Sequence, residues 1–393
     1  MSWAGRRLEV EVGNVAHGGH CVARADGRVV FVRHALPGER VVVEVTEDKG
    51  GSYCRADAIE VLDASADRVE PPCPLARPGG CGGCDWQHAS APAQRRLKAV
   101  VVAEQLRRLA GLETPVEVEE LPGGLLGWRT RVRMVVDGRG RPGFRAHRGH
   151  RVVPVRHCPI AVPDLVEEAG QRRWTRGAEL ALTADSRGRV HAVERPRRGR
   201  ERTVAGDGVA VERAGGRAWR VDAYGFWQVH PEAAEVFAEV VAEWAAAPVG
   251  GTAWDLYAGV GLFASVLAEQ VGSEGTVLAV ESSRGAVAEG RANLADLPQV
   301  SFKTGDTEVV VASSAGRPDV VVLDPPRKGA GRAVVDAVAG HGPARVVYVA
   351  CDPAALARDV AVFAEHGYRL ERLRAFDAFP MTHHVECLAL LSR

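Results

Sequence analysis

Cys351 is the side chain with the clearest potential for covalent chemistry. It ends the apolar run 346–351 and precedes the helical run 354–365. A thiol near a helix N-terminus is favoured as the thiolate, which makes it a candidate nucleophile. The alternative for a lone cysteine is a small buried core residue. We favour the nucleophile because the end of a parallel strand is where open α/β sheets bind ligands.

Glu386 is the second candidate catalytic residue. It lies between Val385 and Cys387 at the start of the last apolar run, 385–391. A carboxylate in a strand that enters the core is a candidate buried base with a raised pKa. An outward-facing position on an edge strand is the alternative that the spacing leaves open.

Two loops are typical of a nucleoside-binding site. Asp255-Leu-Tyr-Ala-Gly-Val-Gly261 contains a GxG turn without the third glycine of the dinucleotide fingerprint, because Ser265 stands there. S-adenosylmethionine therefore fits better than NAD, with Glu281 at the next strand end as a ligand for ribose hydroxyls. A purely structural turn is the alternative. Asp324-Pro-Pro-Arg-Lys-Gly329 follows an apolar strand, and its paired acid and bases predict an active-site loop.

Four of the eight cysteines are candidate metal ligands: Cys73, Cys81, Cys84 and Cys158. Four soft sulfurs suit zinc or an iron–sulfur cluster, and the spacing does not choose between them. Cys21, Cys54 and Cys387 fall in predicted strands, where we expect them to pack in the core.

The elements that must position these residues fall into three regions. After Thr252 the pattern alternates strand, glycine turn and helix, which predicts a doubly wound α/β sheet ending in an antiparallel hairpin. Its expected strands are 253–257, 277–281, 301–304, 320–324, 346–351, 369–375 and 385–391, with helices at 262–270, 284–294, 333–339 and 354–365. Five short strands between residues 8 and 62 predict a small β-barrel of the oligonucleotide-binding type, or another small β-domain. A helix is expected over 92–109, and arginine-rich strands between 128 and 220.

Composition and charge limit the class of protein. With 393 residues the chain is expected to form two or three domains, and 46% apolar content excludes global disorder. No run is long and apolar enough for a membrane span, and the N-terminus lacks a secretory signal, so we expect a cytoplasmic protein with reduced thiols. Net charge is zero, yet residues 128–157 hold nine arginines and one acid, which predicts a basic stripe for RNA.

Together these motifs resemble the S-adenosylmethionine-dependent RNA uracil-C5 methyltransferases, over nearly the whole chain. The resemblance implies a TRAM-like RNA-binding barrel over 1–63, a β-rich central domain over 64–230 and a Rossmann-like class I methyltransferase domain over 231–393. It implies a [4Fe–4S] cluster on the four cysteines named above, Cys351 as nucleophile and Glu386 as base. It also implies a cofactor pocket formed by Gln228, Tyr257, Glu281, Asp306 and Asp324. The chain departs from the family at Leu262 and Asp352, where asparagine is usual.

The resemblance favours 23S ribosomal RNA as substrate of a monomeric enzyme, with the T-loop uridine of transfer RNA as the alternative. Two other classes stay open. A methyltransferase for a small molecule or a protein would leave the barrel and the arginines without a purpose. A metal-bearing RNA-binding protein with an inactive transferase domain would not need both Cys351 and Glu386.

Overall fold

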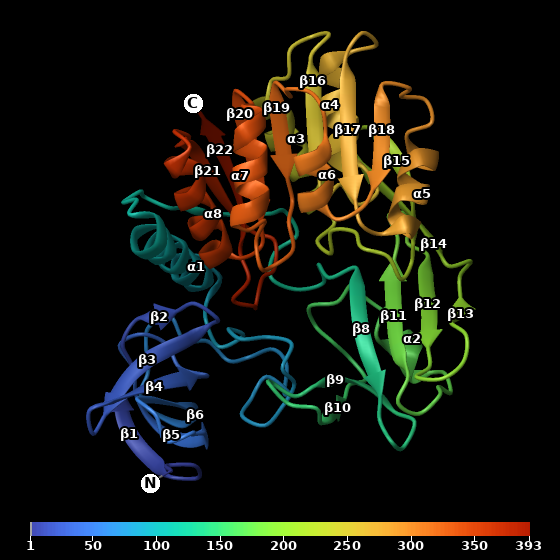
Figure 1. Ribbon diagram of the computed structural model, residues 1–393. Coiled ribbons are helices and arrows are strands. Elements are labelled where there is room, and N and C mark those ends of the chain that lie inside the picture. The colour runs from blue at the N-terminus through green and yellow to red at the C-terminus, as the bar shows by residue number, and fades with distance from the viewer. Residues whose placement is uncertain (1) are drawn as a thin grey trace.

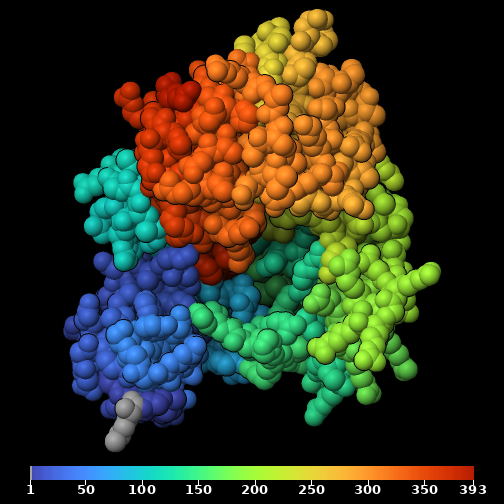
Figure 2. Space-filling view, in the orientation of Figure 1, coloured from blue at the N-terminus to red at the C-terminus, as the bar shows by residue number. Residues whose placement is uncertain are grey.

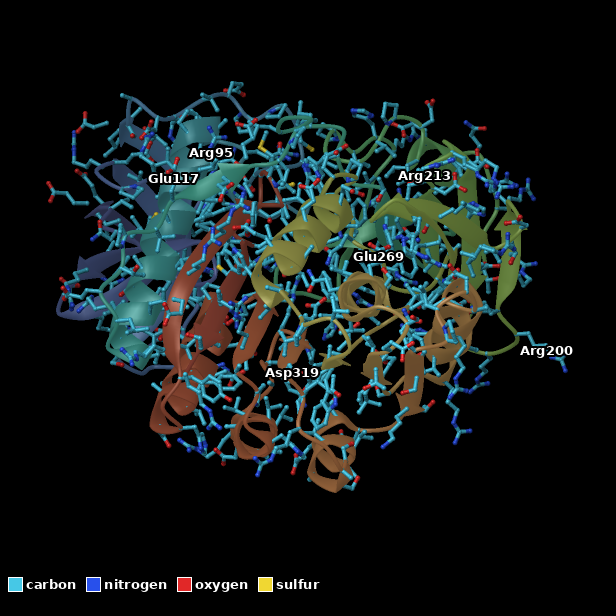
Figure 3. All side chains as sticks on the ribbon, turned by 90° about the horizontal axis from the view of Figure 1, so that it is seen from above. Arg95, Glu117, Arg200, Arg213, Glu269 and Asp319 are labelled. Carbon is cyan, nitrogen blue, oxygen red and sulfur yellow. The ribbon has the colours of Figure 1, made fainter. Side chains whose placement is uncertain are left out.

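The computed structural model describes residues 2–393, which form three β-sheets and a separate hairpin (Figure 1). In Figure 3, Arg95 on α1 lies toward the barrel end of the molecule, and Arg200, on the loop after β12, lies at the opposite end. Within residues 2–393, no helix has both the length and the apolar character needed to cross a bilayer.

The N-terminal strands form the expected small barrel. They are β1 (Arg7–Glu11), β2 (Val15–Ala16), β3 (His20–Ala25), β4 (Arg28–Arg33), β5 (Arg40–Glu47) and β6 (Tyr53–Asp63), in the order β1-β5-β6-β4-β3-β2. The chain between β1 and β2 also bonds to β3, because the Gly13 amide donates to the Val22 carbonyl, so the ring closes. Alternate residues of β5, such as Val41 and Val43, point into its core.

The barrel shares its core with the connector that follows it. Trp86, Ala93, Leu97 and Val101 belong to the same buried cluster as the barrel valines. Three of these four lie on α1 (Ala91–Gln105), which continues as the π-helix η1 (Leu106–Ala110) and ends at Gly111 in the left-handed conformation that glycine tolerates. The packing therefore crosses the domain limit expected at residue 63.

The middle region, where arginine-rich strands are expected, is a second sheet. Its strands are β8 (Arg131–Val136), β9 (Pro142–Arg145), β10 (Val152–Pro154), β11 (Glu179–Ala184), β12 (Val190–Arg195) and β13 (Arg202–Ala205), in the order β10-β9-β8-β11-β12-β13, with the short helix α2 (Glu167–Gly170). A hairpin of β14 (Val209–Ala214) and β15 (Arg217–Asp222) follows, then α3 (Ala233–Ala245). Trp219 and Val221 of this hairpin pack in the core of the C-terminal sheet.

The C-terminal sheet is the doubly wound α/β sheet that the alternation predicts. Its strands are β16 (Thr252–Leu256), β17 (Thr276–Glu281), β18 (Val300–Thr304), β19 (Val320–Leu323), β20 (Arg345–Ala350), β21 (Arg369–Asp377) and β22 (Glu386–Ser392). The helices are α4 (Leu262–Val271), α5 (Arg284–Asn293), α6 (Thr307–Ser313), α7 (Arg332–His341) and α8 (Pro353–Glu365). The strand order is β18-β17-β16-β19-β20-β22-β21-β7, in which β7 (Val118–Glu120) is an unpredicted edge strand.

Both faces of this sheet are buried, as its apolar strands require. Val320 and Val322 face the cluster that includes α3 and α4, whereas Val321 and Leu323 face the cluster that includes α7 and α8. β16 to β20 are parallel, and β22 runs antiparallel between β20 and β21. The Rossmann-like fold and its terminal hairpin are confirmed.

Candidate active site

The predicted catalytic and cofactor residues gather at one edge of the C-terminal sheet. Tyr257, Glu281, Asp306, Asp324 and Cys351 each lie at or just beyond the carboxyl end of a parallel strand. Glu386 begins the antiparallel β22, so its N-terminal end reaches the same edge. This is where an open α/β sheet binds its ligands, because the helices leave a crevice there.

A single cavity of about 1180 Å³ connects these residues. Its walls include all seven predicted residues: Gln228, Tyr257, Glu281, Asp306, Asp324, Cys351 and Glu386. Arg129 and Tyr224 of the middle region also line it. Figure 2 shows the molecule hollowed between the barrel, the middle sheet and the C-terminal sheet. On the side of the barrel and the middle sheet, the cavity is therefore open to a large ligand.

Strand register brings Cys351 and Glu386 together. Ala350 of β20 pairs with Cys387 of β22 in antiparallel register. The next position of that register sets Cys351 opposite Glu386, and directly opposite side chains of an antiparallel pair lie close together. Glu386 is buried, with only 3% of its surface exposed, so the edge-strand alternative is wrong.

Burial and carboxylate neighbours control the acid–base state of this pair. Burial and the nearby Asp324 raise the pKa of Glu386 well above its usual range. Burial likewise raises the pKa of Asp324 to about 7. Burial, helped by the carboxyl groups of Glu386 and Asp324, raises the pKa of the Cys351 thiol to about 12, against the opposing positive charge of Arg327. Burial first, and the neighbouring carboxyl groups second, therefore oppose the thiolate that the position before α8 favours.

The glycine turn after β16 is held by the acid at the end of β17. The Gly259 amide donates to Glu281 Oε2 over 3.0 Å, and Glu281 Oε1 accepts from the Ser283 amide over 2.6 Å. Gly261 has φ +92°, and an added Cβ would lie 2.9 Å from both Leu294 and Phe302, so no larger residue fits. The backbone therefore closes tightly beneath the cavity.

The chemistry of the cavity wall fits S-adenosylmethionine. Glu281, Asp306 and Asp324 present carboxyl oxygens, which accept hydrogen bonds from ribose hydroxyls and amines and attract a positive sulfonium. Asp306 is also the N-cap of α6, accepting from the Glu308 amide over 3.0 Å. Leu262, at the family's asparagine position, is 9% exposed and packs in the core, so it offers the cofactor no polar contact.

The loop after β19 is anchored from beneath by Asp359 of α8. Its carboxylate accepts from the Ala330 amide over 2.7 Å, the Gly331 amide over 3.2 Å and the Tyr348 hydroxyl over 2.5 Å. A Cβ at Gly329 would lie 2.6 Å from Asp359 Oδ2. This close approach explains why the Asp324–Gly329 motif ends in glycine. The sequence of the motif did not reveal that Asp359 of α8 lies against it.

The segment that leads into Glu386 is tied to the connector. The Met381 amide donates to Gln94 Oε1 of α1 over 2.7 Å, and the Asp85 amide donates to the Met381 carbonyl over 2.9 Å. Asp85 also accepts from the His383 amide over 3.1 Å and lies 2.6 Å from His383 Nδ1. These contacts join the cysteine-rich connector to the catalytic edge, and sequence reasoning missed them.

The four predicted ligand cysteines line a second cavity, of about 590 Å³. Cys73, Cys81, Cys84 and Cys158 are all partly buried and free. Within residues 2–393 no group of three or more His, Cys, Asp or Glu side chains has the geometry of a single-ion site. Thiolates around one zinc ion converge to about 2.3 Å from the metal, and the four cysteines are not arranged for such a site.

The loop that holds Cys73, Cys81 and Cys84 packs tightly around that cavity, with glycine at the points of closest approach. A Cβ at Gly80 would lie 2.1 Å from the Leu75 carbonyl oxygen, and one at Gly82 would lie 2.6 Å from the His147 amide nitrogen. Gln87 accepts from the Cys73 amide over 3.0 Å. By contrast, Cys21, Cys54 and Cys387 are at most 1% exposed, which confirms that they pack in the core.

Seven of the nine arginines between residues 128 and 157 are exposed, and two, Arg129 and Arg131, are not. Arg131 is only 8% exposed and pairs with Glu212 over 2.8 Å. Arg133 stacks on Tyr224 with its guanidinium carbon 3.6 Å from the ring centre. Others, including Arg139, Arg145, Arg151 and Arg156, are exposed. The basic stripe for RNA therefore stays a prediction, and the buried Arg131 has a structural role within it.

Comparison with protein families identifies both ends of the chain. A model of the TRAM domain matches residues 3–59. A model described as tRNA (Uracil-5-)-methyltransferase matches residues 314–393, which include Asp324, Cys351 and Glu386. A TRAM barrel joined to a Rossmann-like methyltransferase sheet therefore defines the class of protein.

Relatives extend the match over the full length. An uncharacterized RNA methyltransferase of Streptomyces avermitilis is 48% identical, covering 98% of this chain and 98% of that protein. One from Corynebacterium glutamicum is 39% identical, covering 98% of this chain and 97% of that protein. The chain therefore belongs to the TRAM-containing family of RNA (uracil-5-)-methyltransferases, which confirms the resemblance and the expected enzyme class.

A solved structure shares the whole architecture. The Pyrococcus abyssi tRNA (uracil-54, C5)-methyltransferase, in complex with S-adenosyl-L-homocysteine, matches with a TM-score of 0.72. The match covers 98% of this chain and 100% of that chain at 23% identity. At this identity the likeness shows the common fold.

Proposed function

We propose that this protein transfers a methyl group from S-adenosylmethionine to C5 of a uridine in RNA, through a covalent bond between Cys351 and C6 of the base. One observation carries the proposal: the register of β20 and β22, extended by one residue, sets Cys351 opposite the buried Glu386, in a cavity that Glu281, Asp306 and Asp324 also line. Membership of the family supports the reaction, and the pairing supports the covalent route.

The reaction needs a nucleophile because C5 of uracil is weakly nucleophilic. Once its thiol has lost its proton, the Cys351 sulfur adds to C6, and the electrons of the C5–C6 double bond move into the ring as an enolate. C5 then takes the methyl group as the bond between that group and the sulfonium sulfur breaks, with the electron pair of that bond staying on the sulfur. S-adenosylmethionine, when bound, supplies that methyl group on a positively charged sulfonium, beside the carboxyl groups of Asp324 and Glu281.

Glu386 completes the cycle. It removes the proton from C5, the C5–C6 double bond re-forms, and the electrons of the C6–sulfur bond leave with Cys351. Its burial suits this role, since a base whose pKa is raised holds an abstracted proton more strongly. A uracil within a stem cannot reach the cavity, so the target base is unpaired or flipped.

We further propose that the cavity lined by the four cysteines holds a [4Fe–4S] cluster. Four sulfurs, the tight glycine loop and the spread of the ligands around about 590 Å³ support it. The cluster lies outside the transferase sheet, so we assign it the role of organising the connector and the RNA-facing side rather than a role in methyl transfer.

We favour 23S ribosomal RNA over the transfer RNA T-loop as the substrate, because within the family the barrel and the cysteine cluster occur together more often in ribosomal RNA enzymes. The fold is also compatible with a transfer RNA substrate, since a tRNA (uracil-54, C5)-methyltransferase has the same architecture. Mapping 5-methyluridine in both RNAs from a strain that lacks this protein decides between them. Loss of the modification from transfer RNA alone would reverse the preference.

A metal-bearing RNA-binding protein without activity is the alternative from another class. Transfer of labelled methyl groups from S-adenosylmethionine to RNA isolated from the deletion strain separates the two. No transfer by the anaerobically purified protein, under conditions in which it binds that RNA, would contradict the proposed enzyme.

A further inference from the structure

The turn between β2 and β3 of the barrel touches the catalytic edge of the distant C-terminal sheet. His17 Nε2 lies 2.9 Å from Asp352 Oδ2, a contact between residues 335 positions apart. Asp352 directly follows Cys351 and is the N-cap of α8, where its Oδ1 accepts from the Ala355 amide over 2.8 Å. Each carboxylate oxygen of Asp352 therefore has its own partner.

The same turn also packs against the segment that leads to Glu386. A Cβ added at Gly19 would lie 2.7 Å from the Cβ of His383, so the turn approaches the His383 side chain as closely as glycine permits. The Gly19 carbonyl accepts from Trp86 Nε1 over 3.1 Å. The neighbouring Asp85 in turn binds His383. The turn is thus fixed on both sides, next to each of the two catalytic strands.

We infer that His17 is a positioning residue of the methyl-transfer site, holding the Cys351 loop through Asp352; this inference rests on the proposed function of Cys351. The N-cap bond alone leaves the carboxylate free to turn about its own side-chain bonds. The second bond, from His17, fixes both the carboxylate plane and the point where β20 passes into α8. The RNA-binding barrel is then a structural part of the active site.

The electrostatics of Asp352 agree with this arrangement. Although burial opposes ionisation, the hydrogen bonds from His17 and the Ala355 amide hold the pKa of Asp352 below its usual value. Loss of His17 leaves a half-buried carboxylate with one partner fewer, beside the reacting sulfur. A displacement of about 1 Å at a reacting group lowers a rate by as much as about 100-fold.

The test compares His17→Ala with His17→Gln and with Asn14→Ala as a matched control. Asn14 is an exposed residue on the same stretch of the barrel, before β2. Glutamine places its amide nitrogen close to the position of histidine Nε2, so it can restore the bond to Asp352. We expect His17→Ala to lower kcat about 10- to 100-fold with KM for RNA within about twofold. His17→Gln is expected to recover most of kcat, and Asn14→Ala to keep it.

A second readout does not depend on methyl transfer. The rate at which iodoacetamide alkylates Cys351, followed by peptide mass spectrometry without RNA, is expected to change in His17→Ala and to return toward wild type in His17→Gln. A double change of His17 and Asp352 to alanine is expected to be no worse than Asp352→Ala alone. Melting temperatures check that each variant is folded.

Two results would overturn the inference: an alkylation rate in His17→Ala equal to wild type, or an effect on KM alone, which indicates only an RNA contact. Absence of methyl transfer by the wild-type protein would instead refute the proposed function. The alkylation rates would still decide whether His17 positions the Cys351 loop.

Discussion

The ammonium group of Lys98 and the carboxylate of Asp377 form an ion pair with no more than 1% of either side chain exposed. Lys98 Nζ lies 2.5 Å from Asp377 Oδ1 and 3.1 Å from the Phe379 carbonyl oxygen. Lys98 belongs to α1, whereas Asp377 ends β21, so the pair joins the connector to the segment before Glu386. Burial lowers the pKa of Lys98, and the charge of Asp377 opposes that shift.

Removing one partner of this pair should destabilise the protein strongly. Lys98→Met leaves Asp377 buried without a counter-charge, which costs about 3–5 kcal/mol. The double variant Lys98→Met, Asp377→Leu should regain most of that loss, because no charge stays buried. Urea unfolding measures both. Equal stability of Lys98→Met and wild type would show that the pair is not a structural link.

Covalent catalysis predicts different behaviour for the two catalytic residues. Cys351→Ala should abolish methylation, because no adduct forms. Glu386→Gln should still attack C6 but stall before the C5 proton leaves, so that protein stays attached to RNA. Mass spectrometry of the denatured complex detects the adduct. Full activity of Cys351→Ala would exclude the mechanism.

The raised thiol pKa predicts that Cys351 reacts slowly until a positive ligand binds. Its pKa is about 12 in the free protein, because of burial and the carboxyl groups of Glu386 and Asp324. Below that value, each unit by which a cation lowers the pKa raises the thiolate fraction about tenfold. Alkylation of Cys351 should therefore be faster with the cationic analogue sinefungin than with neutral S-adenosylhomocysteine, both at saturation. Equal rates would show that charge at the cofactor site does not activate the thiol.

The cysteine cavity predicts the metal content of the protein. Anaerobically purified protein should be brown and hold about four irons per chain. Cys81→Ser should lose iron, whereas Cys21→Ser, in the barrel core, should keep it; Cys21 donates to the Ala35 carbonyl and lies away from the cavity. Elemental analysis with the absorption spectrum checks this. Stoichiometric zinc without iron would overturn the assignment.

Local patterns were sufficient to predict most of the C-terminal fold. The apolar run 320–324 corresponds to β19, and the last two runs form an antiparallel hairpin because no helix separates them. The short β7 was not predictable, because its three residues become a strand only by pairing with β21. In the site, the strand ends located the cavity residues, but the sequence contained no sign of His17 beside Asp352 or of the burial that raises the pKa of the Cys351 thiol.

The arginines between residues 128 and 157 predict two different mutational effects. Arg145 is exposed, so Arg145→Gln should leave the fold intact. The slope of log affinity for RNA against log salt concentration should become shallower by about the contribution of one phosphate contact. Arg131 is buried against Glu212, so Arg131→Gln should lower the free energy of unfolding by about 3 kcal/mol or more, because a buried carboxylate loses its partner. RNA binding across a salt series, beside urea unfolding of both variants, separates these effects. If Arg145→Gln leaves the salt dependence unchanged, the exposed arginines do not contact the RNA backbone.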